Sequence, residues 1–175
     1  MAIRDEETLF NALRMGVRYE IEMLQATQHE LVAAGSLGPP IDNAVIESFL
    51  IHARNVFGFL SSKGWMDDVL ASQYVTKAYS FQPSERLVSL TEQINKQISH
   101  LTFGSVGATT LAREERQEVY IELMEGVERF AQCLKPEFIA EWQAVPILTS
   151  DQFVKTEPLP DQAHGEQPYW REFPE

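Results

Sequence analysis

One stretch of the chain places a lysine and a histidine at a spacing that suits phosphate chemistry. Within residues 94–101, Lys96 and His100 are four positions apart, so they share one side of a helix. A histidine with an ordinary pKa of about 6.5 can act as a general acid or base, and a nearby lysine can hold a phosphate oxygen. The same spacing also arises by chance in helices, where such a histidine lies on the surface or caps the helix end. Both interpretations remain open from the spacing alone.

A second stretch, residues 47–55, interrupts a strongly apolar helical pattern with charged and polar side chains. At about 100° per residue, Arg54 and Glu47 lie on one border of the apolar stripe and His52 lies on the other. Arg54 either points into a cleft as an anion-binding group or covers apolar surface with its stem while its head pairs with a carboxylate. The sequence does not decide between these two roles.

The residues required for several common kinds of catalytic site are absent from the sequence. None of the four histidines follows a glutamate by three residues, and no His-x-x-x-His pair is present to hold zinc on a helix. The glycine-rich phosphate loops and the Gly-x-Ser-x-Gly elbow are missing as well. We therefore expect no metal and no cofactor.

Composition narrows the class of partner and the compartment. The 175 residues include 14 Lys and Arg against 26 Asp and Glu, a formal net charge of -12 that disfavours general electrostatic binding to nucleic acid or anionic lipid. The single cysteine, Cys133, allows no internal disulfide and suits a reducing compartment, and we expect it to be a small buried apolar residue. No apolar stretch approaches the length of a membrane span, and the charged start does not resemble a signal peptide. These features predict a cytoplasmic protein that does not enter the membrane.

The apolar periodicity predicts an all-α fold. Four main helices are expected at about residues 5–34, from Asp42 to about 62, from Pro83 to about 103, and 110–134, with a short helical piece at 65–70. The first helix carries an apolar face composed of Phe10, Leu13, Val17, Ile21, Leu24 and Leu31. Short breakers between the helices predict an antiparallel bundle over residues 1–145. Residues 146–175 contain five of the nine prolines and are expected to form an irregular C-terminal strap or arm.

Two surfaces of this bundle are candidates for binding a protein. The outer face of the fourth helix is a run of glutamates, which is either simply solvated or a docking surface for a basic partner. These residues are Glu114, Glu115, Glu118, Glu122, Glu125 and Glu128. The C-terminal arm is too aromatic for a solvated tail, so it either straps the bundle or reaches a partner.

Residues 95–100, Asn-Lys-Gln-Ile-Ser-His, resemble the Arg-Asn-x-x-x-His signature of HEPN domains. HEPN domains are a helical superfamily that includes metal-independent ribonucleases, toxins and noncatalytic nucleotide-binding modules. The stretch from Phe49 to Leu60, together with residues 67–71 and 100–102, is also similar to a group of uncharacterised bacterial helical proteins that we place near HEPN domains. The resemblance covers roughly residues 41–103.

The resemblance implies which residues act. In active HEPN ribonucleases the motif arginine and histidine cluster, often across a homodimer, to bind the scissile phosphate and manage protons, so His100 would transfer a proton. Asn95 stands at the position of the motif arginine and has no charge to stabilise a developing phosphorane. Lys96, at the position of the motif asparagine, or Arg54 would then hold phosphate, with His52 beside them. Asn95 would offer amide hydrogen bonds to the same ligand. The resemblance thus implies a nucleotide- or RNA-phosphate-binding protein whose metal-independent ribonuclease activity is weak or lost.

The alternative hypothesis is a noncatalytic structural or protein-interaction module that uses the acidic helix face and the aromatic arm. In that case the motif residues only stabilise helix junctions. A homodimer fits either hypothesis, because Gly16, Gly58 and Gly126 inside predicted helices would allow two backbones to approach closely. Packing within one chain explains these glycines equally well.

Overall fold

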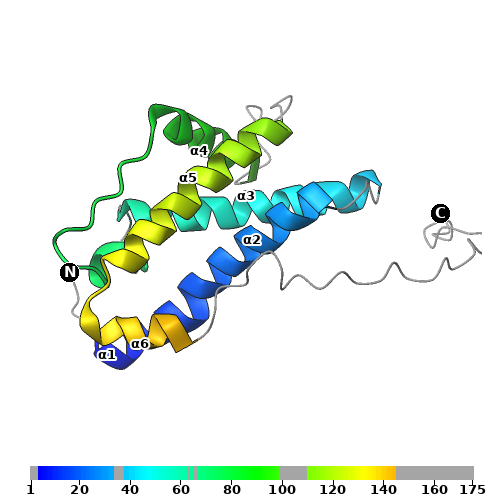
Figure 1. The fold of residues 1–175 in the computed structure, drawn as a ribbon. Helices are drawn as coiled ribbons and strands as arrows, with labels where there is room; N and C mark the ends of the chain where they lie inside the picture. Colours follow the sequence, from blue (N-terminus) through cyan, green and yellow to red (C-terminus); the bar gives the residue numbers. More distant parts are fainter. Residues whose placement is uncertain (1–3, 34–37, 63, 65–66, 99–109, 145–175) are drawn as a thin grey trace, which may run out of the picture.

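The computed structural model describes residues 4–33, 38–62, 64, 67–98 and 110–144, and this part of the chain is all-α (Figure 1). It contains an isolated antiparallel bridge between Val75 and Leu134, and no strand is formed among the described residues. The elements follow one another along the chain as α1 (Glu6–Asn11), η1 (Ala12–Val17), α2 (Arg18–Ala33), α3 (Pro39–Ser61), η2 (Ala71–Gln73), α4 (Glu85–Ile98), α5 (Arg113–Gln132) and α6 (Pro136–Ala144).

The first predicted helix is confirmed, with one distortion. α1, η1 and α2 form one continuous helix in which η1 is a π-helical segment. Asp5 caps its start by accepting a hydrogen bond from the backbone N–H of Thr8 at 2.7 Å. Leu13, Val17, Ile21 and Leu24 of the predicted apolar face are buried, and Phe10 and Leu31 pack partly buried against them.

α3 begins earlier than its predicted cap, Asp42. It starts at Pro39, because a proline in the first turn loses no hydrogen bond and is already fixed near helical φ. Gly38 precedes it with φ 101°, a left-handed conformation that glycine adopts without strain. The helix then runs to Ser61 through the middle of the molecule (Figure 1), and it packs against α2, α4 and α5.

The short helix predicted at 65–70 is wrong in its described part. Residues 67–70 form a turn and an irregular segment, and a single 3-10 turn follows as η2. α4 begins at Glu85 rather than at Pro83, because Ser84 caps the helix by accepting a hydrogen bond from the N–H of Leu87 at 3.0 Å.

The fourth predicted helix is shorter than expected and is followed by a helix that the sequence analysis missed. α5 spans Arg113–Gln132, and Pro136 starts α6 instead of only ending the preceding helix. Phe138 and Trp142 of α6 are buried. Arg18, 2% exposed, donates to the backbone carbonyl of Trp142 at 2.5 Å, which ties α6 to α2.

The four main helices form the antiparallel bundle that the periodicity predicts. Hydrogen bonds between α2 and the C-terminal helices show that α2 and α5 run in opposite directions. Near the end of α2, Gln28 bonds to Gln117 near the start of α5. At the start of α2, Arg18 bonds to Trp142, which lies beyond the end of α5. The core centres on Phe130, whose ring packs edge-on against those of Phe59 and Trp142 at 4.9 and 5.3 Å between centroids. Residues 145–175, including the predicted arm, lie outside the described residues. Within the described ranges, no helix is long and apolar enough to cross a membrane.

Candidate functional site

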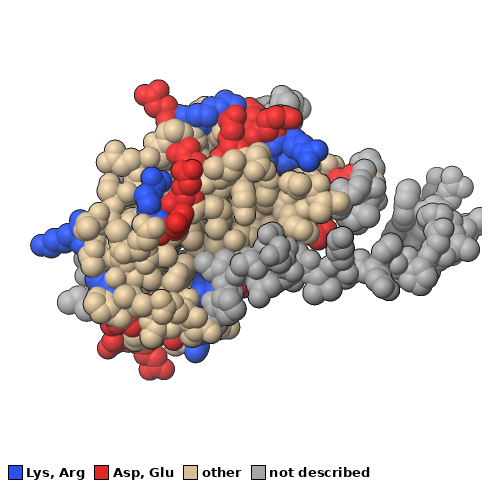
Figure 2. Space-filling view, viewed as in Figure 1, with Lys and Arg blue, Asp and Glu red and all other residues tan. Residues whose placement is uncertain are grey.

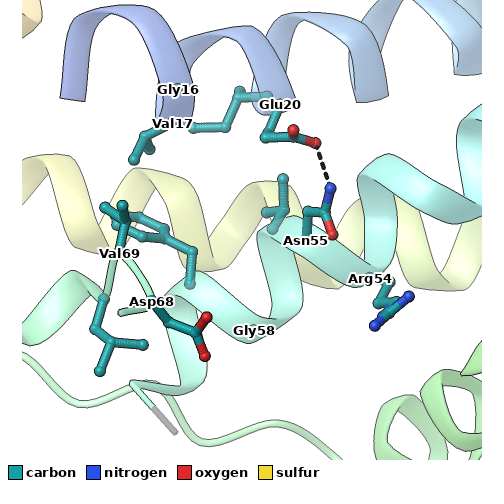
Figure 3. Close-up of a pocket in the computed structure, with 12 residues that line it drawn as sticks. Gly16, Val17, Glu20, Arg54, Asn55, Gly58, Asp68 and Val69 are labelled. Carbon is teal, nitrogen blue, oxygen red and sulfur yellow. Dashed lines mark hydrogen bonds between the residues drawn. The ribbon is translucent and has the colours of Figure 1, made fainter. Parts of the chain in front are cut away.

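A cleft of about 390 Å³ opens between the first helix, α3 and the segment that follows α3 (Figure 3). Three chain segments line it: four residues around the junction of η1 and α2, five residues of α3, and residues 68–70. The lining residues are Gly16, Val17, Glu20, Ile21, Arg54, Asn55, Val56, Gly58, Phe59, Asp68, Val69 and Leu70. Its size lies at the lower end of the range that is usual for ligand sites, about 300–1,000 Å³.

Two glycines keep the cleft open. A Cβ atom built on Gly16 or on Gly58 would have no heavy atom within 4 Å beyond its chain neighbours and its own helix. Gly16 also belongs to the π-helical segment, and single π turns are frequent at functional sites because they re-aim side chains. Gly126 differs, because a Cβ there would lie 2.7 Å from the Phe81 ring and 2.8 Å from Leu60. Of the three glycines, Gly126 serves packing within the chain, while Gly16 and Gly58 face open space.

Glu20 is the most firmly held polar side chain of the cleft. Its Oε2 accepts hydrogen bonds from His52 Nδ1 at 2.7 Å and from Asn55 Nδ2 at 3.0 Å. Burial raises the pKa of Glu20, but these hydrogen bonds outweigh burial, so the pKa lies below its ordinary value and the carboxylate stays ionised. Because an ionised carboxylate only accepts, His52 carries its proton on Nδ1. Tyr19 packs edge-on against the His52 ring at 5.6 Å, which fixes the ring further.

The other two charged side chains of the cleft are Asp68 and Arg54. Figure 3 shows the carboxylate of Asp68 on the side of the cleft near Gly58, apart from that of Glu20, while the guanidinium of Arg54 lies at the edge of the cleft and points away. Arg54 is exposed and forms no ion pair or hydrogen bond with any described residue. The interior of the cleft is therefore lined by two carboxylates, with a cation only at its rim.

Four large apolar side chains on the three segments that form this cleft remain in contact with solvent. Met15, Tyr19, Ile51 and Val69 are 70%, 51%, 44% and 38% exposed. Val69 lines the cleft, and Met15 adjoins Gly16. Tyr19 and Ile51 adjoin Glu20 and His52 in sequence, and these two residues bond to each other. We call these four residues the apolar rim.

The residues predicted to bind phosphate are only partly brought together. Arg54 lines the cleft, whereas His52 is buried and bonds to Glu20 without lining the cleft itself. Asn95 and Lys96 are exposed on α4 and line neither this cleft nor a smaller hollow of about 210 Å³ between α3 and the end of α4. His100 lies outside the described residues.

The acidic face of α5 is partly occupied by α4. Arg86 pairs with Glu115 at 2.7 Å and with Glu118 at 3.3 Å, and Glu122 accepts from the backbone N–H and hydroxyl of Ser84 at 2.6 and 2.7 Å. Figure 2 shows basic and acidic side chains interleaved along the edge of the molecule where α4 and α5 lie. Half of the predicted acidic surface therefore holds the bundle together instead of facing solvent alone. Cys133, expected to be buried, is half-buried.

The described residues contain no group of three or more histidine, cysteine, aspartate or glutamate side chains that could hold a metal ion. Comparisons with protein-family models, with curated proteins and with solved structures found no match to this chain. The interpretation of the cleft therefore depends on its own geometry.

The cleft is not predicted by the sequence pattern, although several of its residues stand out there. Gly16 and Gly58 were the available signal, because glycine inside a helix costs about 1 kcal/mol relative to alanine and needs a reason. That these two glycines face the same open space follows from the antiparallel packing of α2 on α3, which the local pattern does not reveal.

Proposed function

We propose that the protein is a noncatalytic interaction module that docks a segment of a protein partner over the cleft between α2 and α3. The observation that supports the proposal is the apolar rim, four large apolar side chains left in solvent on the three segments that form the cleft, of which Val69 lines the cleft itself. Contiguous exposed apolar surface around a groove is typical of a protein-binding site, whereas scattered exposed residues are ordinary.

The shape of the site suits a helical or extended segment. The cleft runs between two antiparallel helices whose facing glycines carry no side chain, so the backbone of a partner can approach closely at Gly16 and Gly58. Bonds within the chain hold Glu20, His52 and Asn55 in place, so the site is formed before a partner arrives. The lone cysteine favours the reducing cytoplasm as the compartment of this interaction.

Photo-crosslinking from the rim tests this proposal. A photoreactive amino acid replaces Met15 in cells that naturally contain the protein, and the matched control replaces Ile121, an apolar residue of α5 that is 48% exposed and does not line the cleft. We expect a discrete crosslinked product from position 15 and none from position 121. A product of twice the mass of the chain would identify a second copy as the partner. Equal, diffuse labelling from both positions would contradict the proposal.

A second candidate function is the phosphate binding that the HEPN resemblance implies. The observation in its favour is the exposed guanidinium of Arg54, which no carboxylate of the described residues neutralises. Lys96 is likewise exposed, on the helix that packs beside α3. Together with His100, these cations would bind a nucleotide or an RNA phosphate at the rim of the bundle, outside the carboxylate-lined interior of the cleft.

Incubation with a mixed-sequence RNA in the absence of divalent metal tests the second candidate. Products ending in cyclic phosphate that vanish in both Arg54→Ala and His100→Ala would establish a ribonuclease. Binding without cleavage that is lost in Arg54→Ala but unaffected by Arg113→Ala, an exposed arginine of α5, would establish a phosphate-binding module. If the wild-type protein neither binds nor cleaves the RNA, this candidate function is ruled out.

A further inference from the structure

A second hollow, of about 410 Å³, lies between the last residues of α3 and the segment from Ser72 to Phe81. It shares no lining residue with the cleft, and five of its ten lining residues are serine or threonine. We propose that this hollow binds the phosphate group of a small soluble molecule, with the negative charge balanced by Lys77 and the oxygens bonded by serine hydroxyls. The inference concerns a site of its own and does not depend on the docking function.

Hydrogen bonds between its two walls hold the hollow in shape. The hydroxyl of Tyr79 donates to the backbone carbonyl of Leu60 at 3.1 Å, and the backbone N–H of Ser72 donates to Ser62 Oγ at 3.0 Å. Each bond joins the end of α3 to the segment that follows η2 or to η2 itself. The hollow is therefore formed before a ligand arrives, which lowers the cost of binding one.

The serine hydroxyls of the hollow are available as donors. Ser62 Oγ accepts from the N–H of Ser72, and Ser80 Oγ accepts from Gln82 Nε2 at 3.3 Å. A hydroxyl that accepts in this way keeps its own O–H for a further partner. Phosphate oxygens only accept hydrogen bonds, and bonds that end on a charged acceptor are the strong ones. The chemistry of these side chains thus matches an oxyanion better than a cation.

Ser61 carries a polar group that the fold leaves unsatisfied. Its side chain lines the hollow, and its Oγ is buried without a hydrogen-bond partner among the described residues. A buried polar group without a partner costs about 1–3 kcal/mol and needs an explanation. A ligand oxygen at the floor of the hollow would supply the missing partner, because a serine hydroxyl re-orients by rotation about one bond.

The charges around the hollow favour an anion. Lys77 lines it, is exposed and pairs with no carboxylate of the described residues, and the described lining residues include no aspartate or glutamate. The guanidinium of Arg129 lies 6.0 Å from the centre of the Phe81 ring, which also lines the hollow. The end of α3 contributes about half a negative charge, which the full charge of Lys77 outweighs.

The size of the hollow and the charge of the whole chain limit the ligand to a small molecule. A volume of about 410 Å³ lies within the usual range for small-molecule sites. The formal net charge of -12 disfavours a polyanion that would extend over the surface, so the favourable charge of this hollow acts only locally. Leu60, Val75 and Phe81 provide apolar walls for the part of the molecule that carries the phosphate.

A phosphate monoester and its neutral parent compound test the inference. The probe is glycerol 3-phosphate, with glycerol as the neutral control and sodium chloride as the control for ionic strength. Binding is followed by the backbone amide NMR signals of Ser61, Ser62 and Lys77 in the full-length protein, with those of Gly16 and Gly58 reporting on the cleft. We expect glycerol 3-phosphate to shift the first group of signals in a saturable way and both controls to leave them unchanged.

Variants of the hollow complete the experiment. Lys77→Gln and Ser61→Ala should each weaken binding of glycerol 3-phosphate by about three- to tenfold. Arg113→Gln and Ser89→Ala are the matched controls on exposed positions outside the hollow and should leave binding unchanged. Because Ser61 Oγ has no partner in the fold, Ser61→Ala should not lower the temperature of thermal unfolding, which separates a ligand-binding role from a structural one.

Three results would overturn the inference. They are the absence of a saturable shift with glycerol 3-phosphate, equal shifts with glycerol, and binding that is unchanged in Lys77→Gln. Shifts confined to Gly16 and Gly58 would place the phosphate at the cleft instead and would also overturn it. None of these results bears on crosslinking from position 15, so the docking function is tested separately.

Discussion

Replacing each of two helical glycines by alanine should change the stability of the protein in opposite directions. Gly58 and Gly126 both lie inside helices, where alanine is favoured over glycine by about 1 kcal/mol. At Gly58 the new methyl group meets no atom within 4 Å, so Gly58→Ala should stabilise the protein by about 0.5–1 kcal/mol. At Gly126 the methyl group meets Phe81 at 2.7 Å and Leu60 at 2.8 Å, and overpacking of this kind costs about 1–3 kcal/mol.

The net change expected for Gly126→Ala is therefore a loss of roughly 0–2 kcal/mol, and the two variants should differ by about 1–3 kcal/mol. Urea unfolding followed by circular dichroism measures this difference, provided that the slope with denaturant stays the same in both variants. If Gly126→Ala proved as stable as Gly58→Ala, the close packing of α5 against Leu60 and Phe81 would be refuted.

Three further changes test the rest of the fold and the site. The hydrogen bonds to Glu20 hold its pKa below the ordinary value near 4.5. The contribution of the Glu20 carboxylate to the free energy of unfolding should therefore be complete above about pH 4.5 and be lost as the pH falls through the lower pKa of the folded state. Wild type should then exceed Glu20→Gln by about 1 kcal/mol at pH 7 and approach it in acid, and a pH-independent gap between their urea midpoints would contradict this reasoning. Arg18→Ala should lower the free energy of unfolding by about 2–4 kcal/mol, because it removes a buried guanidinium from the Trp142 carbonyl. It should also expose α6 to limited proteolysis. Resistance equal to that of the wild type would show that Arg18 does not anchor α6. Phe130→Ala should lose about 3–5 kcal/mol from the aromatic core, and a loss below 1 kcal/mol in thermal unfolding would place Phe130 outside it.

Much of the bundle was predictable because its helices bury regular apolar stripes. Val119, Leu123, Val127 and Phe130 are buried on α5 as their spacing predicts, and Leu87, Leu90 and Ile94 are buried on α4. These outcomes follow from a period of about 3.6 residues, which each helix carries in its own sequence.

The features that the sequence did not reveal depend on contacts between distant segments or on local backbone chemistry. The π-helical segment at Ala12–Val17 leaves the apolar spacing of Leu13 and Val17 unchanged, so the pattern contains no sign of it. Pro136 follows the apolar stripe of α5 and so indicates the end of that helix, although proline equally suits the first turn of a helix such as α6.

The candidate site was harder to predict than the fold for the same reason. His52 and Arg54 stand out in the sequence because they interrupt an apolar stripe. In the structure His52 is a buried partner of Glu20, and Arg54 lies at the edge of the cleft. Gly16, Glu20, Gly58 and Asp68 come to line one cleft only once α2, α3 and the segment after α3 have packed together. Periodicity within one helix does not encode the register between two helices.

Filling the cleft between α2 and α3 is the most direct test of whether this cleft docks a partner. Gly58→Leu starts a large side chain at a position where an added Cβ meets no atom within 4 Å, and thermal unfolding of the variant is the check that the fold is retained. The measurement is the yield of crosslinked partner from a photoreactive residue at position 15, compared between Gly58→Leu and wild type. The account predicts that the crosslinked product disappears in the filled variant. An undiminished yield from a folded Gly58→Leu protein would contradict the claim that the cleft is the docking site.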